Sequence, residues 1–414
     1  MRIFKFGGAS IKNAEGVKNL ASVLEKTGCE NKVVVISAMG KITNALEKVI
    51  EIYFEKEKID LDYLKSYHLE ILTDLFESRS HRVYTEVNTL FGELESFLKR
   101  NKSPNYDYVY DQVISFGELI STTIVSIFLN DNHIKNEFLD ARNLVKTNQV
   151  YRDAKVNWDA TCKKINTAIQ SDKLYITQGF IASDVHNFTT TLGREGSDYT
   201  AAIFAYCLKA EDVTIWKDVD GVFNGDPRVF ENTTLLNEVS YTEAIELAFY
   251  GASIIHPKTL QPLQKREIPL IVKSFYHPEN AGTLVSNGNK INPLIPCFIV
   301  KKNLVLISLS ALDFSFFVEE NISEVFALLH QYQLKVDVIQ NSAISFSVVV
   351  DNRFNQVDKL INHLKGKFRV SFNKNVSLYT IRHFTESAIN QIEKDKEVLL
   401  KQLTRETVQL VTKE

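Results

Sequence analysis

Two polar, glycine-bearing loops stand at the two ends of one helix and strand in residues 189–228, and this arrangement restricts the possible folds more than any other feature. The first loop, residues 192–198, contains two glycines, which allow the backbone to approach a ligand closely. Ser197 or Asp198 is expected to cap a helix over residues 199–209, where the apolar positions share one face. A helix start with free backbone N–H groups after a glycine loop is suited to binding an anion.

A buried strand is expected next, at residues 213–216, and the second loop begins at its carboxyl end with Lys217 and Asp218. In open α/β sheets, ligands bind at the carboxyl ends of the strands. Either loop alone is more typical of tight turns around an ordinary crossover helix. Their combination on one helix–strand unit predicts a ligand-binding edge of an α/β sheet.

The order of strand, small polar turn and helix also occurs twice near the N-terminus. An expected strand at residues 2–6 runs into a glycine pair, and the β-branched strand at residues 32–36 ends in the turn 37–40. Neither turn matches the G-x-x-x-x-G-K-[ST] phosphate loop or the G-x-G-x-x-G dinucleotide pattern. Lys5 lies inside the first strand, and the pattern alone favours an exposed edge lysine.

Residues 44–130 are expected to be mostly helical, with charged faces in solvent. Glu118 differs from these charges, because it stands among apolar and small residues in the segment 114–121. A carboxylate there is costly to bury unless it meets a cation. It therefore points outward or binds an ammonium, and the pattern alone favours the outward orientation. His256 precedes a proline without a His/Cys cluster and is interpreted as a turn residue.

Strands alternate with helices to about residue 285, which predicts an α/β domain with a largely parallel central sheet. Residues 304–372 then have the order strand, helix, strand, strand, helix, strand of a ferredoxin-like α+β sandwich. A strand at 377–381, a helix over 388–403 and a strand at 407–411 are expected to follow. The predicted division is an α/β domain (1–286), a linker (287–296), a ferredoxin-like unit (297–375) and a truncated second unit (376–414).

Composition mainly excludes classes of protein. The hydrophobic content of 44% and the charged content of 24% are ordinary for a soluble globular protein. The net charge of -3 gives no reason to expect a nucleic acid or an anionic membrane as partner. No signal-peptide core or apolar run of membrane-spanning length is expected. The cysteines are far apart without a C-x-x-C pair, which predicts reduced thiols and a cytoplasmic protein: Cys29, Cys162, Cys207 and Cys297.

Six motifs resemble those of aspartate kinases, which belong to the amino-acid kinase superfamily and carry C-terminal ACT domains. The motifs are K-F-G-G-A-S at 5–10, S-A-M-G-K-I-T-N at 37–44, F-G-E-L-I-S at 116–121, T-L-G-R-E-G-S-D-Y-T-A at 191–201, D-V-D-G-V-F-N-G-D-P-R at 218–228 and H-P-K-T-L at 256–260. Each is weak alone, but six in family order are a specific signal that covers nearly the whole chain. The resemblance implies an amino-acid kinase fold followed by a ferredoxin-like ACT regulatory region.

The resemblance also implies a reaction, in which ATP phosphorylates the side-chain carboxylate of L-aspartate in the first step of lysine, threonine and methionine biosynthesis. Mg²⁺ would bridge the nucleotide phosphates, and no protein metal site is expected. Lys5 would neutralise the transferring phosphoryl group, and Asp198 would orient Lys5 or the substrate. These two are the expected catalytic residues.

The family pattern implies two further sets of residues. The expected aspartate-binding residues are Thr43, Glu118, Phe180, Arg194 and Ser197. The expected ATP-binding residues are Gly7, Gly8, Ser10, Gly40, Lys217, Asp218, Phe223, Arg228 and Ser253. Arg194 would bind a carboxylate with its fork of donors, Glu118 would bind the ammonium, and backbone N–H groups of the glycines would hold phosphate oxygens.

Three residues depart from the family pattern. Ala9 stands in place of the usual threonine, Glu195 in place of a glycine, and Ser253 where many members carry a lysine. Glu195 is expected to point away from the phosphates, because it adds a negative charge beside them. The alternatives to an aspartate kinase are a kinase for a related acceptor such as glutamate and a catalytically weak amino-acid-binding regulator. Glu118 argues against an N-acetylated acceptor, which has no ammonium to pair.

Regulation is expected to be atypical, because the second ACT-like unit stops after strand, helix and strand. This truncation leaves an unpaired sheet edge, which another subunit or the first unit must cover. Asp337 stands where the family's first unit meets an amino-acid effector, with Asn341 and Ser342 nearby. An exposed aspartate at a strand end is the alternative. We expect a homodimer whose first ACT units pair, with feedback inhibition by lysine or threonine that is weak or absent.

Overall fold

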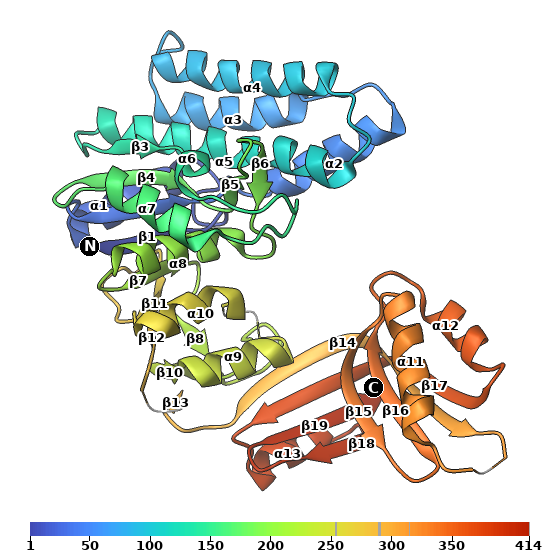
Figure 1. Cartoon of the computed structure of the whole chain (residues 1–414). Coiled ribbons are helices and arrows are strands. Elements are labelled where there is room, and N and C mark those ends of the chain that lie inside the picture. The colour runs from blue at the N-terminus through green and yellow to red at the C-terminus, as the bar shows by residue number, and fades with distance from the viewer. Residues whose placement is uncertain (253–254, 289–290, 314, 414) are drawn as a thin grey trace. The chain divides into compact units, whose positions relative to one another are not determined.

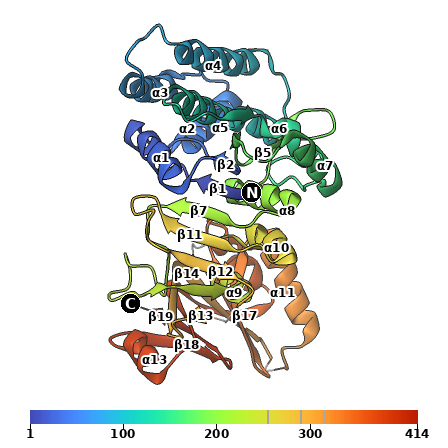
Figure 2. The same cartoon turned by 90° about the vertical axis from the view of Figure 1, so that its left-hand side faces the viewer.

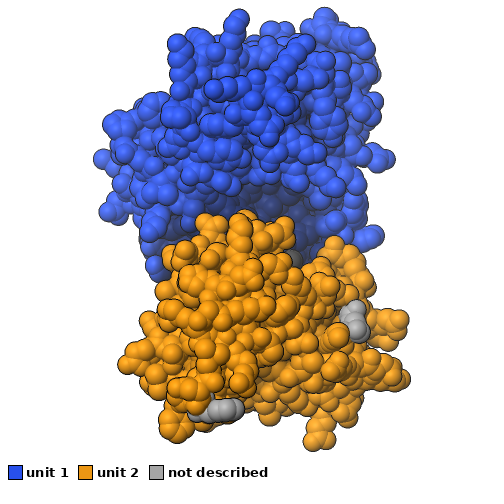
Figure 3. All heavy atoms as spheres, turned by 90° about the vertical axis from the view of Figure 1, so that its right-hand side faces the viewer, with its two compact units in different colours: residues 1–222, 235–245, 254–293 blue, residues 223–234, 246–253, 294–414 orange. Residues whose placement is uncertain are grey.

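The computed structural model describes residues 1–252, 255–288, 291–313 and 315–413, which divide into two compact units (Figure 3). Unit 1 comprises residues 1–222, 235–245 and 254–293, and unit 2 comprises 223–234, 246–253 and 294–414. Two short segments from the region assigned to the α/β domain, 223–234 and 246–253, thus lie in unit 2. The domain boundaries drawn from the sequence stay a prediction.

Unit 1 is built on a largely parallel sheet, as predicted. Its strands are β1 (Arg2–Phe6), β2 (Lys32–Ile36), β3 (Glu137–Leu139), β4 (Leu174–Gln178), β7 (Val213–Lys217), β10 (Glu238–Ser240), β11 (Leu270–Ser274), β12 (Thr283–Ser286) and β13 (Ile291–Asn292). Among the described residues these nine form one sheet in the order β13-β10-β12-β11-β7-β1-β2-β4-β3 (Figure 1). Every pairing from β11 through β7, β1, β2 and β4 to β3 is parallel. The antiparallel pairings are β11 with β12 and β10 with β13.

The helices of this part of the chain follow the predicted alternation with the strands. They are α1 (Ala14–Thr27), α2 (Ile42–Glu55), α3 (Asp62–Leu75), α4 (Arg82–Arg100), α5 (Tyr106–Asp131), α6 (Ala141–Leu144), α7 (Trp158–Ala168), α8 (Gly196–Leu208), α9 (Tyr241–Tyr250) and α10 (Pro257–Arg266). Asn13 caps α1, with its Oδ1 accepting the N–H of Gly16 at 3.0 Å. The predicted cap of α8 is wrong, because α8 begins at Gly196 and places Ser197 and Asp198 in its first turn.

Helix α5 is long and apolar enough to cross a membrane by length and composition, which the sequence analysis did not expect. However, 89% of its apolar window is buried inside the protein. It lies beside α2 and packs against α2, α4 and β4 (Figure 2). Its apolar side chains belong to the main hydrophobic core. In this structure α5 is therefore a core helix that carries Glu118 into the centre of unit 1.

Unit 2 contains one continuous antiparallel sheet. Its elements are β14 (Cys297–Ala311), α11 (Glu319–Gln331), β15 (Lys335–Asn341), β16 (Ser345–Asp351), α12 (Val357–Leu364), β17 (Phe368–Arg382), α13 (Glu386–Glu393), β18 (Glu397–Leu403) and β19 (Thr407–Lys413). Six described strands pair in the order β15-β16-β14-β17-β19-β18. The central strands β14 and β17 are both 15 residues long, so they serve two ferredoxin-like halves at once.

The second half of unit 2 differs from its prediction in one helix. The predicted helix over 388–403 ends at Glu393, and β18 occupies the remainder, because a short apolar run such as 397–403 fits either a helix or a strand. The edge left by the truncated unit is covered by the first unit, one of the two expected alternatives: the first residues of β14, from Cys297 to Lys301, pair with β17 from Arg382 back to Leu378. A strand that precedes the first half thus completes the sheet of the second.

Three clusters bury the two faces of this sheet. Val305 and Ile307 of β14 face α11 and α12 in one cluster, whereas Leu304 and Leu306 lie in another with Val411 of β19. The third cluster joins α13 to β17 and β19. The alternation along β14 is that of a strand buried on both faces.

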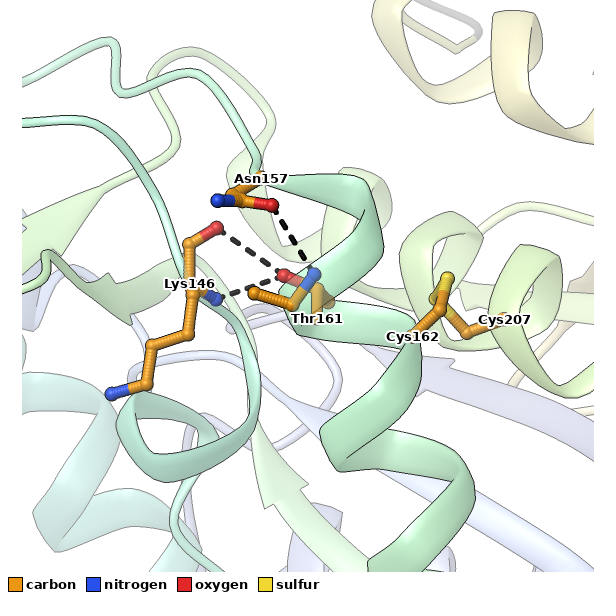
Figure 4. Close-up of a disulfide and its surroundings, with 6 residues drawn as sticks. Lys146, Asn157, Thr161, Cys162 and Cys207 are labelled. Atoms are coloured by element: carbon orange, nitrogen blue, oxygen red, sulfur yellow. Dashed lines mark hydrogen bonds between the residues drawn. A yellow bond between two sulfur atoms is a disulfide. The ribbon is translucent and has the colours of Figure 1, made fainter.

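The prediction that all cysteines are reduced is wrong for one pair. Cys162 of α7 and Cys207 of α8 form a disulfide (Figure 4). Cys29 and Cys297 are free thiols. The sequence separation of 45 between Cys162 and Cys207 conceals that α7 and α8 pack side by side. Thr161, next to Cys162, fixes α7 by exchanging hydrogen bonds with the backbone of Lys146.

Candidate active site

The turns after β1, β2 and β4 meet at one edge of the sheet, because these three strands are adjacent and parallel. Together with α5 and the glycine loop before α8 they enclose a cavity of about 450 Å³, a size typical of small-molecule sites. Its lining is Lys5, Gly8, Ser37, Ala38, Gly40, Thr43, Tyr110, Glu118, Arg152, Phe180, Gly193, Arg194, Glu195, Gly196, Ser197 and Asp198. The cavity brings together both expected catalytic residues and all five expected aspartate-binding residues.

Lys5 forms an ion pair with Asp198 inside this cavity. Its Nζ lies 2.6 Å from Asp198 Oδ1, and the two side chains are 12% and 6% exposed. The strand that carries Lys5 lies between β2 and β7, so the interpretation as an exposed edge lysine is wrong. Asp198 stands in the first turn of α8, where the helix dipole stabilises a negative charge. The pair presents a positioned ammonium to the cavity.

Glu118 is buried, so the outward orientation favoured by the pattern is wrong. Only 3% of the residue is exposed, because α5 approaches the turn after β2 so closely that a Cβ on Gly117 would lie 3.0 Å from the Cβ of Ala38. The Ala38 N–H donates to Glu118 Oε1 at 3.3 Å, while Oε2 has no hydrogen-bond partner among the described residues. Burial raises the pKa of Glu118 to about 8, more than the Ala38 hydrogen bond lowers it. Among the residues that the structure describes, this carboxyl group has no ion-pair partner.

Two cavity residues, Tyr110 and Arg152, are absent from the sequence predictions. The Arg152 guanidinium lies 4.5 Å from the centre of the Tyr110 ring, with Nη1 3.3 Å from Asp107 Oδ1. Tyr110 lies two helical turns before Glu118 in α5, so helical spacing predicts that the two share one face of the helix. No motif or spacing marks Arg152.

Two glycines allow close packing at the base of the cavity. A Cβ on Gly8 would lie 2.5 Å from the carbonyl oxygen of Ala38, and a Cβ on Gly196 would lie 2.4 Å from Phe180 Cδ2. The N–H of Gly40 donates to the carbonyl of Gly8 at 3.0 Å, which ties the first two turns together. These residues therefore shape the cavity, whatever they bind.

Glu195 occupies the N-cap position of α8 with φ of 52°, a left-handed conformation that favours glycine. Its Oε2 accepts the backbone N–H of His256 at 2.8 Å. His256 in turn accepts the N–H of Lys258 and caps α10, so its interpretation as a structural residue is confirmed. The charge of Glu195 is thus used to hold the glycine loop against the start of α10.

Several expected ATP-binding residues lie outside the cavity lining. Lys217 is the last residue of β7 and Asp218 follows it in unit 1, whereas Phe223 and Arg228 belong to unit 2. Arg228 pairs with Asp226 at 2.7 Å. Ser253 lies outside the described residues. Within the described part of the chain, no group of three or more His, Cys, Asp and Glu side chains could hold a metal ion.

The remaining expected ATP-binding residues are Gly7 and Ser10, and neither lines the cavity. Ser10 is buried beside β7, and Gly7 accepts its N–H. Of the expected effector residues, Asn341 and Ser342 are exposed, while the Asp337 side chain is 5% exposed and pairs with Lys301. The exposed-aspartate interpretation of Asp337 is therefore wrong.

Comparison with known proteins identifies the family. The sequence profile of the amino acid kinase family matches residues 1–274. Lysine-sensitive aspartokinase 3 of Escherichia coli (strain K12) is 31% identical over 348 residues, which cover 83% of this chain and 76% of that protein. The chain belongs to the amino acid kinase family, as an aspartokinase.

Two further relatives extend this result. A bifunctional aspartokinase/homoserine dehydrogenase of Buchnera aphidicola subsp. Acyrthosiphon pisum (strain APS) is 33% identical over 302 residues, which cover 70% of this chain but 37% of that protein. The solved structure of E. coli aspartokinase III with lysine and aspartate (T-state) has a TM-score of 0.82 at 26% identity and covers 99% of this chain and 95% of that one. The predicted amino-acid kinase fold with an ACT-like C-terminal sheet is confirmed.

Proposed function

We propose that the chain is an aspartate kinase, which phosphorylates the side-chain carboxylate of L-aspartate with ATP to give 4-phospho-L-aspartate and ADP. One observation carries this proposal: Glu118, Lys5 and Arg194 line a single cavity. A buried carboxyl group with no cation beside it in the described part of the chain, together with two positive side chains, complements the one ammonium and two carboxylates of aspartate. The reaction would supply lysine and threonine biosynthesis in the cytoplasm.

Each cavity residue has a role in this reaction. The substrate ammonium binds Glu118 Oε2, and one carboxylate binds the guanidinium fork of Arg194. The side-chain carboxylate oxygen then attacks the γ-phosphorus, and the bond to the β–γ bridging oxygen breaks, so that ADP leaves with the electron pair. Lys5, held by Asp198, neutralises charge on the transferring phosphoryl group.

ATP enters as its Mg²⁺ complex, in which the metal neutralises phosphate charge. The chain's own part is to hold the phosphates at the turns after β1 and β2, with Gly7, Gly8, Ser10 and Gly40. Gly40 must exchange its hydrogen bond with Gly8 if its N–H binds a phosphate oxygen. In unit 1, the end of β7 and the loop that follows it contribute Lys217 and Asp218. For Phe223, Arg228 and Ser253 a nucleotide-binding role stays a prediction from the family pattern.

The proposal is tested by ADP release with Mg-ATP and L-aspartate, L-glutamate or N-acetyl-L-aspartate as acceptor. We expect turnover with L-aspartate and a loss of about 10²–10³ in kcat for Lys5→Ala, because a charge stabiliser is removed. Lys18→Ala, on the exposed face of α1, is the matched control and should retain full turnover. Higher kcat/KM with L-glutamate would assign the related acceptor, and no turnover with any acceptor would favour the binding regulator.

The regulatory proposal is a homodimer with weak or absent feedback inhibition. The solved relative from E. coli is a complex with lysine, which makes lysine the first effector to test and threonine the second. Asp337, with Asn341 and Ser342, is the proposed effector site. Activity across a lysine and a threonine titration tests it, and strong inhibition that Asp337→Ala abolishes would contradict the expected insensitivity.

A further inference from the structure

The proposed effector site of unit 2 already contains an ammonium group, which belongs to the chain itself. Lys301 Nζ lies 2.7 Å from Asp337 Oδ1, and the Asp337 side chain is 5% exposed. The Lys301 side chain is 22% exposed, so a lysine, normally a surface residue, is largely enclosed here. A carboxylate buried to this extent needs a cation, and Lys301 provides it.

The backbone irregularities of two strands bring these residues together. Lys301 is the last residue of β14 to pair with β17 before a register shift, and Asp337 is the extra residue at a register shift of β15. Val336 and Val338, on either side of Asp337, consequently pack into clusters on opposite faces of the sheet. A bulge re-aims a side chain in this way. Asp337 turns toward Lys301 although β16 separates their strands.

The aliphatic part of the Lys301 side chain is also enclosed, because it packs against Gly251. A Cβ on Gly251 would lie 2.6 Å from Lys301 Cε and 3.4 Å from Cγ, so the stem lies directly over this glycine within unit 2. The ion pair between Lys374 of β17 and Asp358 of α12 lacks such enclosure. These two side chains also lie 2.7 Å apart, but they are 44% and 69% exposed.

We propose that Lys301 is a built-in ligand of the Asp337 site, where it takes the place of the ammonium of a free amino acid. A free amino acid binds there only by displacing Lys301. Its new ion pair with Asp337 then replaces the Lys301–Asp337 pair, so binding adds little net stabilisation. The site is therefore closed in the native chain and opens to primary ammonium compounds when the Lys301 side chain is shortened. This inference rests on the proposed function for its regulatory meaning, whereas the ion pair stands without it.

Thermal unfolding of the full chain tests the inference without using activity. Lys301→Ala should lower the melting temperature by several degrees, because it leaves a buried carboxylate unpaired. Ethylammonium chloride and L-lysine should restore it, measured against sodium chloride at equal ionic strength. By calorimetric titration, Lys301→Ala should bind L-lysine about tenfold or more tightly than the native chain.

Two variants serve as controls. Lys374→Ala removes the exposed pair of the same sheet and should show neither the loss nor the rescue. Lys301→Ala combined with Asp337→Asn removes the site itself and should not respond to ethylammonium or L-lysine. If Lys301→Ala does not fold, Lys301→Val, which suits a strand and also leaves the far end of the stem and the ammonium position empty, must show the same rescue.

Equal L-lysine affinity of the native chain and Lys301→Ala would overturn the inference, as would a Lys301→Ala variant as stable as the native chain. ADP release from L-aspartate without effector is measured in parallel on the native chain. That assay judges the proposed function, while the thermal rescue judges the role of Lys301, so the two can fail separately.

Discussion

Aspartate binding should depend steeply on pH, because the proposed ammonium ligand is protonated in the free protein. Burial raises the pKa of Glu118 to about 8, well above its ordinary value of 4.5. A carboxyl group with this pKa is ionised in roughly one tenth of the molecules at pH 7 and in about half at pH 8. The substrate ammonium pairs with the ionised form, so bound aspartate selects it.

The size of the effect follows from the ionised fraction. The apparent Kd equals the intrinsic Kd divided by the fraction of binding-competent protein, so it should fall about fivefold from pH 7 to pH 8. At pH 7, binding should also release about 0.9 proton per aspartate. The interval from pH 7 to 8 separates Glu118 from two neighbouring groups. Asp111, which accepts the N–H of the cavity residue Arg152, has a pKa raised by burial to about 6, and burial raises the pKa of Tyr110 above its ordinary value.

Isothermal titration of L-aspartate in two buffers with different ionisation enthalpies measures both the Kd and the proton count. Glu118→Gln should weaken binding at pH 8 and lose the pH dependence, since an amide mimics the protonated acid. Glu47→Gln, which removes a carboxylate bonded to Tyr110 outside the cavity lining, is the matched control and should retain the dependence. A Kd that is constant from pH 7 to 8, or a dependence that persists in Glu118→Gln, would refute this reasoning.

Three further predictions concern the same cavity. Arg194→Lys should raise the KM for aspartate about tenfold or more and leave the KM for ATP unchanged in steady-state assays, because a point charge cannot replace a bidentate fork; equal effects on both KM values would indicate a structural role. Gly196→Ala should destabilise the protein by about 1–3 kcal/mol in denaturant unfolding, since its Cβ would lie 2.4 Å from Phe180 Cδ2; an unchanged midpoint would show that the loop yields freely. Without aspartate, Glu118 stabilises the native state at low pH, where it is protonated, and this contribution is lost as the pH rises toward and through 8. The free energy of unfolding of Glu118→Gln, relative to that of the native chain, should therefore rise by about 2 kcal/mol between pH 6 and pH 8. A difference that does not change with pH would contradict a buried, protonated carboxyl group.

Local sequence pattern predicted the elements of unit 1 well because strand and helix periodicities differ clearly there. The strands Arg2–Phe6 and Lys32–Ile36 have the predicted bounds. The pattern failed for side chains whose surroundings are set by distant segments. The pattern predicted that Lys5 and Glu118 are exposed to solvent, and both predictions are wrong. Strands β2 and β7 flank the strand of Lys5, and the turn after β2 covers Glu118.

Unit 2 shows a different limit of sequence reasoning. Residues 297–301 complete the sheet of its second half by pairing with the end of β17, which lies about eighty residues later in the chain. No local sequence signal indicates that one strand serves both halves. The predicted helix over 388–403 is too long, because the apolar positions of residues 397–403 fit a helix as well as a strand. The Cys162–Cys207 disulfide likewise depends on how α7 and α8 pack, which spacing in the sequence does not reveal.

The charges of the cavity explain why a protonated Glu118 is compatible with an acidic substrate. The charged residues of its lining are Lys5, Arg152, Arg194, Glu118, Glu195 and Asp198. At pH 7 Glu118 is mostly protonated, which leaves three positive and two negative groups, so the free cavity attracts the net negative charge of aspartate. Once the substrate ammonium arrives, Glu118 ionises and the charges of the lining balance. Of the two described departures from the family pattern, Ala9 is exposed outside the lining and does not enter this balance, whereas Glu195 is one of its two negative groups, held by the backbone N–H of His256.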